Sequence, residues 1–406
     1  MWQWVSSFSV AILSLFFCIE DSVYAGAGDS YDDIYDDAPT SKYTPSSDAT
    51  STFSFEHYVL TELLRDLHYP KAIESIIVNK VAHHADSQEE ITVVAERDGA
   101  LVILTSQGNV KRFPIALEQL YTQGQGGVID LLIPHNFADT GQILLSYSKG
   151  NDDANKLAVV KARLSLVSGV SHIEQIFEVK QSKDTPVHYG GKMVELAPNA
   201  FLITSGDGFD YREQAQRLQS HLGKVIGFTL QGEPLENPPF PENPYIYTLG
   251  HRNPQGLVID DNGQVYQHEH GPDGGDEFNL LTPGQNYGWP VVTLGKDYSG
   301  ARISPFTEYP GMTPPLVDWT PSIAPSAMLY YTKEAFPSLQ QSFLVTSLKA
   351  KTVYMVRRSG DNYASSPIIE QVNQRIRDIT SDSQGNLFIL TDGHSGSVIK
   401  VSAPAT

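Results

Sequence analysis

The chain has 406 residues, of which 40% are hydrophobic, and it carries a formal net charge of −19 at pH 7. This length suffices for one large all-β domain or for two ordinary domains. The acidic balance argues against a nucleic-acid partner, because the phosphates would be repelled.

The first 25 residues are typical of a secretory signal peptide. An apolar run from Val10 to Ile19 precedes a small-x-small cleavage pattern at 23–25. The run is too short to span a bilayer, so we expect no membrane-spanning segment and an exported protein, periplasmic or secreted after cleavage. The single cysteine, Cys18, lies inside this segment. The mature chain would therefore have no disulfide, and burial and bound metal would have to stabilise it.

Two further segments precede the main domain. Residues 26–54 are rich in Asp, Ser, Thr, Gly and Pro, a composition that predicts a disordered acidic leader. In residues 55–74, the leucines at 60, 63, 64 and 67 recur at helical spacing and Pro70 closes the pattern. We therefore expect a short N-terminal helical extension packed on the surface of the main domain.

From residue 75 to 402 the chain repeats one pattern six times: an apolar strand that ends in small and polar residues. The six strands begin at Ile91, Ile143, Phe201, Val265, Phe343 and Leu387. A supersecondary unit that recurs at this spacing is typical of a β-propeller, whose blades have about four strands each. The sequence thus predicts an all-β fold, a six-bladed β-propeller.

Equivalent strands of different blades point the same way along the central channel, so the polar ends of all six units should meet at one end. The segments that precede the partner strands should meet there too, because each hairpin returns to its starting face. The side chains expected at this end are Gln125, His188, Arg252, Asn253, Lys349, Arg375 and Arg377. Several cations gathered in an acidic protein indicate a polyanionic ligand.

The stretch 248–300 is the densest cluster of polar and special-geometry residues. An Asp-Asn-Gly turn at 261–263 lies between two apolar runs, which predicts a hairpin that brings Arg252 and Asn253 close to residues 269–272. An acidic pair, Asp276 and Glu277, comes next in a glycine-rich loop. Such loops can offer carboxylate and carbonyl oxygens to Ca²⁺, although an ordinary solvated loop is an equally good interpretation of the spacing alone.

Several motifs resemble the family of soluble quinoprotein glucose dehydrogenases and aldose sugar dehydrogenases. They are GHRNPQG at 250–256, EHGP at 269–272, GDEFNLL at 275–281 and NYGWP at 286–290. GQGGVIDLLIPHNF at 124, HYGGKMVE at 188, LGKVIGFTLQGE at 222, SLKAKTVYMV at 347 and RIRDITSDSQGNLFILTD at 375 also occur in family order. The resemblance implies a six-bladed propeller that binds pyrroloquinoline quinone (PQQ), a tricarboxylate, together with Ca²⁺.

The resemblance also implies roles for individual residues. His188 would take the proton of the sugar C1 hydroxyl while hydride passes to the quinone. Arg252 and Asn253 would contact the quinone, Gln125 would lie near the substrate, and Lys349, Arg375 and Arg377 would hold the cofactor carboxylates. Carbonyl oxygens of Gly271 and Pro272 would bind the Ca²⁺ that polarises the quinone. Asp276, Glu277, Tyr287 and Asp297 would mark a second, structural Ca²⁺ region.

Three positions depart from the family pattern. Lys192 stands where an arginine is usual, Asp130 replaces a small residue, and Val187 replaces an acidic residue before His188. Because the last change removes a possible substrate contact, we expect broad aldose use in place of strict glucose preference. The electron acceptor would be external, for example a cytochrome or a quinone. Two alternatives stay open: a catalytically silent propeller that binds a protein or glycan, and a Ca²⁺-dependent hydrolase or lactonase.

Overall fold

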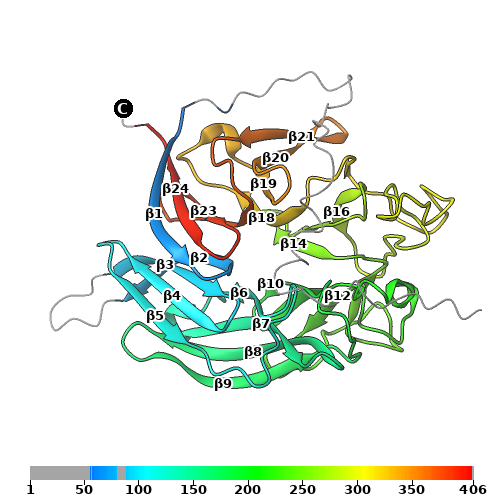
Figure 1. The fold of residues 1–406 in the computed structure, drawn as a ribbon, viewed down its shortest axis with the longest axis horizontal. Coiled ribbons are helices and arrows are strands. Elements are labelled where there is room, and N and C mark those ends of the chain that lie inside the picture. The colour runs from blue at the N-terminus through cyan, green and yellow to red at the C-terminus, as the bar shows by residue number, and fades with distance from the viewer. Residues whose placement is uncertain (1–54, 56, 80–87, 405–406) are drawn as a thin grey trace, which may run out of the picture.

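The computed structural model describes residues 55, 57–79 and 88–404, and nearly all the regular structure there is β-strand (Figure 1). The expected signal peptide (1–25) and acidic leader (26–54) lie outside the described residues. Within the described ranges, no helix is long and apolar enough to cross a membrane. The helical segments are short: α1 (Phe137–Thr140), η2 (Arg212–Gln216) and η3 (Pro337–Leu339).

The strands form six antiparallel sheets of four strands each, which are the blades of the predicted propeller (Figure 1). The first three blades, from inner to outer strand, are β2 (Pro70–Asn79), β3 (Gln88–Glu96), β4 (Ala100–Thr105) and β5 (Val110–Pro114); β6 (Val128–Leu132), β7 (Gln142–Gly150), β8 (Asn155–Ser165) and β9 (Gly169–Glu178); and β10 (Gly190–Ala197), β11 (Ala200–Ser205), β12 (Lys224–Phe228) and β13 (Ile246–Leu249). The last three are β14 (Pro254–Ile259), β15 (Val265–Glu269), β16 (Asp276–Leu281) and β17 (Val317–Trp319); β18 (Pro325–Tyr331), β19 (Ser342–Ser347), β20 (Val353–Ser359) and β21 (Asn362–Ile369); and β22 (Ile376–Ser381), β23 (Leu387–Thr391), β24 (Gly396–Ser402) and β1 (Val59–Leu67).

The inner strands of neighbouring blades contact one another around a closed ring: β2 meets β6 and β22, and β14 meets β10 and β18. The apolar clusters lie between adjacent blades, so the second strand of a blade is buried on both faces. Phe201, Leu202 and Ile203 of β11 are all fully buried, for example. This explains why these strands appear in the sequence as continuous apolar runs. The six runs are the second strands β3, β7, β11, β15, β19 and β23, as predicted.

The expected helix at 58–67 is wrong, because this segment is the strand β1. It pairs antiparallel with β24, from Val59 opposite Ser402 to Leu67 opposite Gly396, and so completes the last blade. In Figure 1 the blue β1 lies beside the red β24. The propeller therefore begins at Val59 and not near residue 75, and the segment 55–74 is no separate extension. The register of β1 shifts twice, which disturbs the alternation that would have indicated a strand.

Candidate functional site

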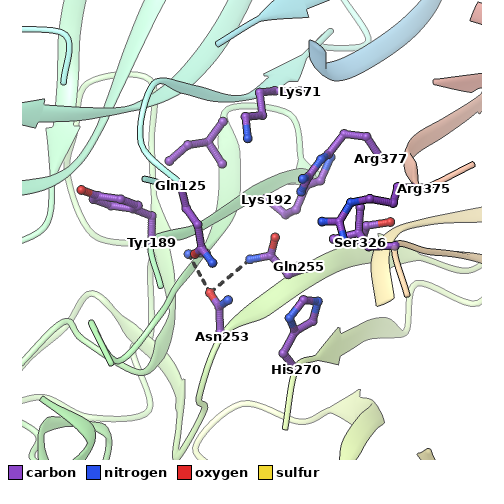
Figure 2. A pocket seen from close by; sticks show the side chains of 13 residues that line it. Lys71, Gln125, Tyr189, Lys192, Asn253, Gln255, His270, Ser326, Arg375 and Arg377 are labelled. Atoms are coloured by element: carbon purple, nitrogen blue, oxygen red, sulfur yellow. Dashed lines mark hydrogen bonds between the residues drawn. The ribbon is translucent and has the colours of Figure 1, made fainter. Parts of the chain in front are cut away.

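The inner strands surround a cavity, partly open to solvent, at one end of the channel (Figure 2). Every blade contributes to its wall from the inner strand or the residues just before it. The charged and polar side chains that line it are Lys71, Gln125, Tyr189, Lys192, Asn253, Gln255, His270, Ser326, Arg375 and Arg377. Four of these are Lys or Arg, and none of the described residues in the lining is Asp or Glu. The cavity is therefore basic, although the chain as a whole has a net charge of −19.

The residues predicted to bind cofactor and substrate converge with one exception. Gln125, Asn253, Arg375 and Arg377 line the cavity. His188 and Arg252 are buried beside it, and the Gln125 side chain joins them because its Oε1 accepts a hydrogen bond from the His188 backbone N–H at 2.9 Å. Lys349 is not in the lining, where its neighbour Leu348 takes the place; the backbone N–H of Lys349 donates to Ile323 O at 3.2 Å.

Arg375 and Arg377 are held in place by one buried carboxylate. Arg375 Nε lies 3.0 Å from Asp392 Oδ2, and Arg377 Nε lies 2.8 Å from Asp392 Oδ1. Burial alone would raise the pKa of Asp392, but Arg377, Lys71 and Arg375 outweigh it and hold that pKa well below its ordinary value. Asp392 is therefore ionised, and its single charge is shared between two guanidinium groups. The pair keeps positive charge for a ligand, as the alternation Arg375-Ile376-Arg377 indicated.

Lys192 forms the floor between this cavity and a second one further along the channel. Its Nζ lies 2.9 Å from Asp130 Oδ1 and 3.2 Å from Asp378 Oδ2, and both carboxylates line the second cavity only. Burial would lower the pKa of Lys192, but the two carboxylates raise it above its ordinary value. The departures from the family pattern at Lys192 and Asp130 are therefore linked, because the two side chains form an ion pair. Lys192 stays positively charged at the floor of the cavity.

His188 is oriented by a carboxylate that the sequence analysis did not single out. His188 Nδ1 lies 2.7 Å from Asp207 Oδ1, and Trp289 Nε1 donates to Asp207 Oδ2 at 2.7 Å. All three side chains are buried. Burial and the nearby Arg252 lower the pKa of His188 more than Asp207 raises it. The imidazole is therefore neutral near pH 7, with its Nδ1 proton directed at Asp207 and its Nε2 left as the basic nitrogen.

The loop that carries Asp207 requires glycine on both sides. A Cβ at Gly206 would lie 2.2 Å from His188 O, and Gly208 has a φ of +75° where a Cβ would meet Lys183. The backbone N–H of Asp207 donates to Arg252 O at 2.7 Å, which ties the loop to the next blade. The signal in the sequence was present: Asp207 lies in the polar end of the third repeat, FLITSGDG. Its role becomes visible once β10 and β11 pair within the third blade, because this pairing places Asp207 beside His188.

The hairpin between β14 and β15 brings together the groups that its turn predicted. Arg252 Nη1 donates to His270 O at 3.1 Å and to Gly271 O at 2.6 Å. Glu269 accepts from Arg252 N at 2.5 Å and lies 3.0 Å from His251 Nδ1. The guanidinium group of Arg252 is therefore fixed by backbone carbonyls at the mouth of the site. These include the carbonyl of Gly271, which we expected to face a metal ion.

The side chains expected at a second metal region do not converge on one point. Asp276 accepts hydrogen bonds from four donors, Gly271 N, Ser322 Oγ, Ile323 N and Ala324 N, and so fastens the loop to the next blade. Tyr287 stacks on His251 and donates to Leu280 O, whereas Asp297 bonds to Ser299 in an exposed turn. Among the described residues, no three His, Cys, Asp or Glu side chains are grouped as a metal site.

The six-bladed fold thus places a basic cavity beside a histidine that a buried carboxylate orients. Residues 80–400 match the family model Glucose / Sorbosone dehydrogenase, and the chain belongs to this family. It is an oxidoreductase, as predicted.

Relatives of known sequence or structure support this family assignment. The chain is 36% identical to the aldose sugar dehydrogenase YliI of Escherichia coli K12 over 293 residues, which are 70% of this chain and 79% of that protein. It is 31% identical to quinoprotein glucose dehydrogenase B of Acinetobacter calcoaceticus, over 43% of this chain and 48% of that one. The crystal structure of the soluble aldose sugar dehydrogenase of Escherichia coli in its apo-form superposes with a TM-score of 0.77 and 31% identity, covering 86% of this chain and 100% of that one.

Proposed function

We propose that this protein oxidises the C1 hydroxyl of aldose sugars to lactones, with PQQ as hydride acceptor and Ca²⁺ as a second cofactor. The observation that carries the proposal is a cavity whose charged lining residues are all basic, beside a neutral, oriented His188. Support comes from the similarity to a quinoprotein and to an aldose sugar dehydrogenase.

The cavity suits a polycarboxylate with a flat ring system. Arg375 and Arg377 present planar forks that can each pair with a carboxylate, and Lys71 and Lys192 add point charges from other blades (Figure 2). The amides of Asn253 and Gln255 stand across from them and can donate to ring oxygens (Figure 2). PQQ has this chemistry, and when bound it would supply the electrophilic carbon that accepts hydride.

His188 would act as the general base. Its Nε2 would take the proton of the sugar C1 hydroxyl, which leaves the two electrons of the C1–H bond to depart as hydride. Asp207 would stabilise the imidazolium that forms, because a buried carboxylate 2.7 Å away offsets the cost of a buried charge. Arg252 lies beside His188 and would stabilise negative charge that develops on an oxygen in the site.

Calcium would bind close to this site through the carbonyl oxygens of Gly271 and Pro272, with Glu277 in a structural position nearby. Glu277 is paired in register with Glu269 across β15 and β16, and its pKa is raised well above its ordinary value by burial and by Glu269. Two neighbouring carboxylates, the buried Glu269 and the half-buried Glu277, favour the uptake of a cation. Asp276 has a different role, since its oxygens accept the hydrogen bonds that hold the loop, and it is not among the proposed metal ligands.

The alternative of a Ca²⁺-dependent hydrolase would require carboxylates that hold a metal and a water in the cavity. The described lining offers cations and amides instead. A silent binding module would have no use for an oriented base beside this cavity. We further propose an external electron acceptor and export from the cytoplasm, which the apolar run at 10–19 supports.

The decisive experiment reconstitutes purified protein with PQQ and Ca²⁺ and measures aldose oxidation with an artificial dye and without NAD. His188→Gln should bind PQQ like the wild type while its turnover falls roughly 10²- to 10⁴-fold, the usual loss for a general base. Arg377→Ala should instead weaken PQQ binding by about 2 to 5 kcal/mol, because a buried carboxylate would lose its partner. If the wild type bound no PQQ at micromolar concentration with Ca²⁺ present, the assignment would fall.

A further inference from the structure

A fully buried lysine, the first residue of β12, fastens the connection that joins β11 to β12. Lys224 has no solvent exposure, and its Nζ donates to three backbone carbonyls: Gln214 O at 2.8 Å, Ala215 O at 2.9 Å and Leu222 O at 2.8 Å. An ammonium group has three N–H donors, so all of them are used. Among the described residues, no carboxylate forms an ion pair with Lys224. Neutralising a buried acid is therefore not its role.

The three carbonyl oxygens point at one centre, an arrangement that proteins also use to bind metal cations. Here the ammonium group of Lys224 occupies the centre. Burial lowers the pKa of Lys224 to about 7, whereas the three carbonyls act in the opposite direction, because each accepts a hydrogen bond from the charged form. An apolar side chain of the same size would deprive three buried carbonyls of this donor, which is costly. The conformation of the connection therefore depends on the ammonium group.

Two routes connect this lysine to Asp207. In the backbone, the N–H of Gly223 donates to Gly206 O at 3.0 Å, directly before Asp207. Through side chains, Gln216 Nε2 donates to Trp289 O at 2.7 Å, and Trp289 Nε1 donates to Asp207 Oδ2 at 2.7 Å. Gln216 is the last residue of η2 and follows one of the three bound carbonyls. A shift of η2 would therefore move Asp207 and, with it, the imidazole that Asp207 orients.

We propose that Lys224 is a positioning residue, whose ammonium group acts as a built-in cation that holds the 206–223 connection and thereby places Asp207 against His188. The inference rests on the proposed function, because it names what positions the carboxylate beside the base of that site. Lys224 is not among the residues that line the basic cavity, so it contacts neither PQQ nor sugar there. Loss of its ammonium group would lower kcat through the orientation of the imidazole and would leave the affinities for PQQ and sugar in place.

The test is chemical rescue of Lys224→Ala, which removes from the side chain the atoms of one propylammonium ion. In the PQQ- and Ca²⁺-loaded variant we expect kcat for glucose to fall roughly 10- to 10²-fold, because the base is misplaced, while KM and PQQ affinity stay near the wild-type values. Propylammonium supplied throughout purification should restore part of kcat. Two additives should not: 1-propanol, which has a similar size and no charge, and tetramethylammonium, a cation without N–H groups.

Tryptophan fluorescence gives a second readout that needs neither cofactor nor turnover. Trp289 donates to Asp207, and Trp319 is the only other tryptophan among the described residues. The emission of Trp289 should change in Lys224→Ala and return with propylammonium. The change should be absent when Lys224→Ala is combined with Trp289→Phe. Lys180→Ala, which removes an exposed lysine, is the matched control and should equal the wild type in emission and in kcat, with or without propylammonium.

Unchanged kcat and emission in Lys224→Ala would overturn the proposal. Equal rescue by 1-propanol would also overturn it, because only space would then have to be filled, and so would a rise in KM that accounts for the whole loss. If Lys224→Ala does not fold in plain buffer, its refolding yield must be higher with propylammonium than with 1-propanol, and equal yields would contradict the role of the charge. If the wild type oxidised no aldose but the emission responded as described, the proposed function would fail and the role of Lys224 would remain.

Discussion

His188 and Asp207 form a buried pair in which Nδ1 of the imidazole lies 2.7 Å from Oδ1 of the carboxylate. The pair joins the segment before β10 to the end of β11, and Trp289 from the next blade donates to the other carboxylate oxygen. Because Asp207 fixes the tautomer, the base depends on it as much as on the imidazole itself.

We therefore expect Asp207→Asn to lower kcat by roughly 10²- to 10⁴-fold, because the amide can donate to Nδ1 and so favour the tautomer whose Nε2 carries the proton. PQQ affinity should not change, and a fluorescence or absorbance titration checks this. Trp289→Phe removes only one hydrogen bond to Asp207 and should lower kcat by about tenfold or less. Equal losses in both variants would contradict the assigned role of Asp207.

The pH dependence follows from the lowered pKa of His188. Burial is the main cause and Arg252 adds to it, so the base is neutral above its ordinary pKa of 6.5 and for some distance below. We expect kcat/KM to be flat near neutral pH and to fall only in acid. In the unfolded chain the imidazole takes up its proton at a higher pH than in the folded chain, so acidification below 6.5 should also cost stability.

Melting temperatures across a pH series test the second part. The acid loss should be smaller in His188→Gln than in the wild type. His172→Gln, which changes an exposed imidazole, should behave like the wild type. An acid limb of kcat/KM above pH 6.5 in the wild type would contradict the lowered pKa.

Lys192→Met should destabilise the protein strongly. It would leave Asp130 and Asp378 buried near each other without their shared cation, a loss of about 3 to 5 kcal/mol in the free energy of unfolding. Lys192→Arg keeps the charge and should cost much less. The pair of Lys156 and Glu178 is more exposed, so Lys156→Met should cost about 1 kcal/mol or less. Urea unfolding of the three variants provides the measurement. Similar losses in both methionine variants would contradict the role of Lys192 as the shared cation of Asp130 and Asp378.

Removal of Ca²⁺ should lower the melting temperature by a few degrees relative to saturating Ca²⁺, because binding to the folded state alone stabilises it by mass action. The difference should grow from mildly acidic to mildly alkaline pH, since the raised pKa of Glu277 makes protons compete with the ion. Glu277→Gln should reduce it. A melting temperature that does not change when a chelator is added would contradict the proposed structural Ca²⁺.

The repeated strands were predictable because each is buried on both faces and its apolar run is continuous. β1 was not, since the leucines at 60, 63, 64 and 67 fit a helical period and the strand exists only through its pairing with β24, more than 300 residues away. A helix that packed through these four leucines would bury Leu63, but in the structure its side chain is 38% exposed. Local periodicity contains no information on such a distant partner.

Some residues of the site were likewise predictable from the sequence, and others were not. Arg375 and Arg377 were predictable from their alternation, and Arg252 and Asn253 from the hairpin. Lys71, on the first inner strand, was missed because that strand was taken for part of the extension. Lys349 was assigned to the cavity because it comes after a polar strand end, but the chain turns so that Leu348 fills the wall. Asp207 acquires its role from the pairing of β10 with β11, which brings it to His188, and from the Trp289 side chain of the next blade.

The closure of the ring by β1 and β24 bears on how the chain is made. Val59–Leu67 is synthesised more than 300 residues before its partner, Gly396–Ser402. Until Gly396–Ser402 is made, β1 has no strand to pair with. A chain cut short before Gly396 would keep two unpaired strand edges, β1 and β23, which are templates for association with other chains. Premature termination should therefore yield aggregates and not a smaller functional propeller.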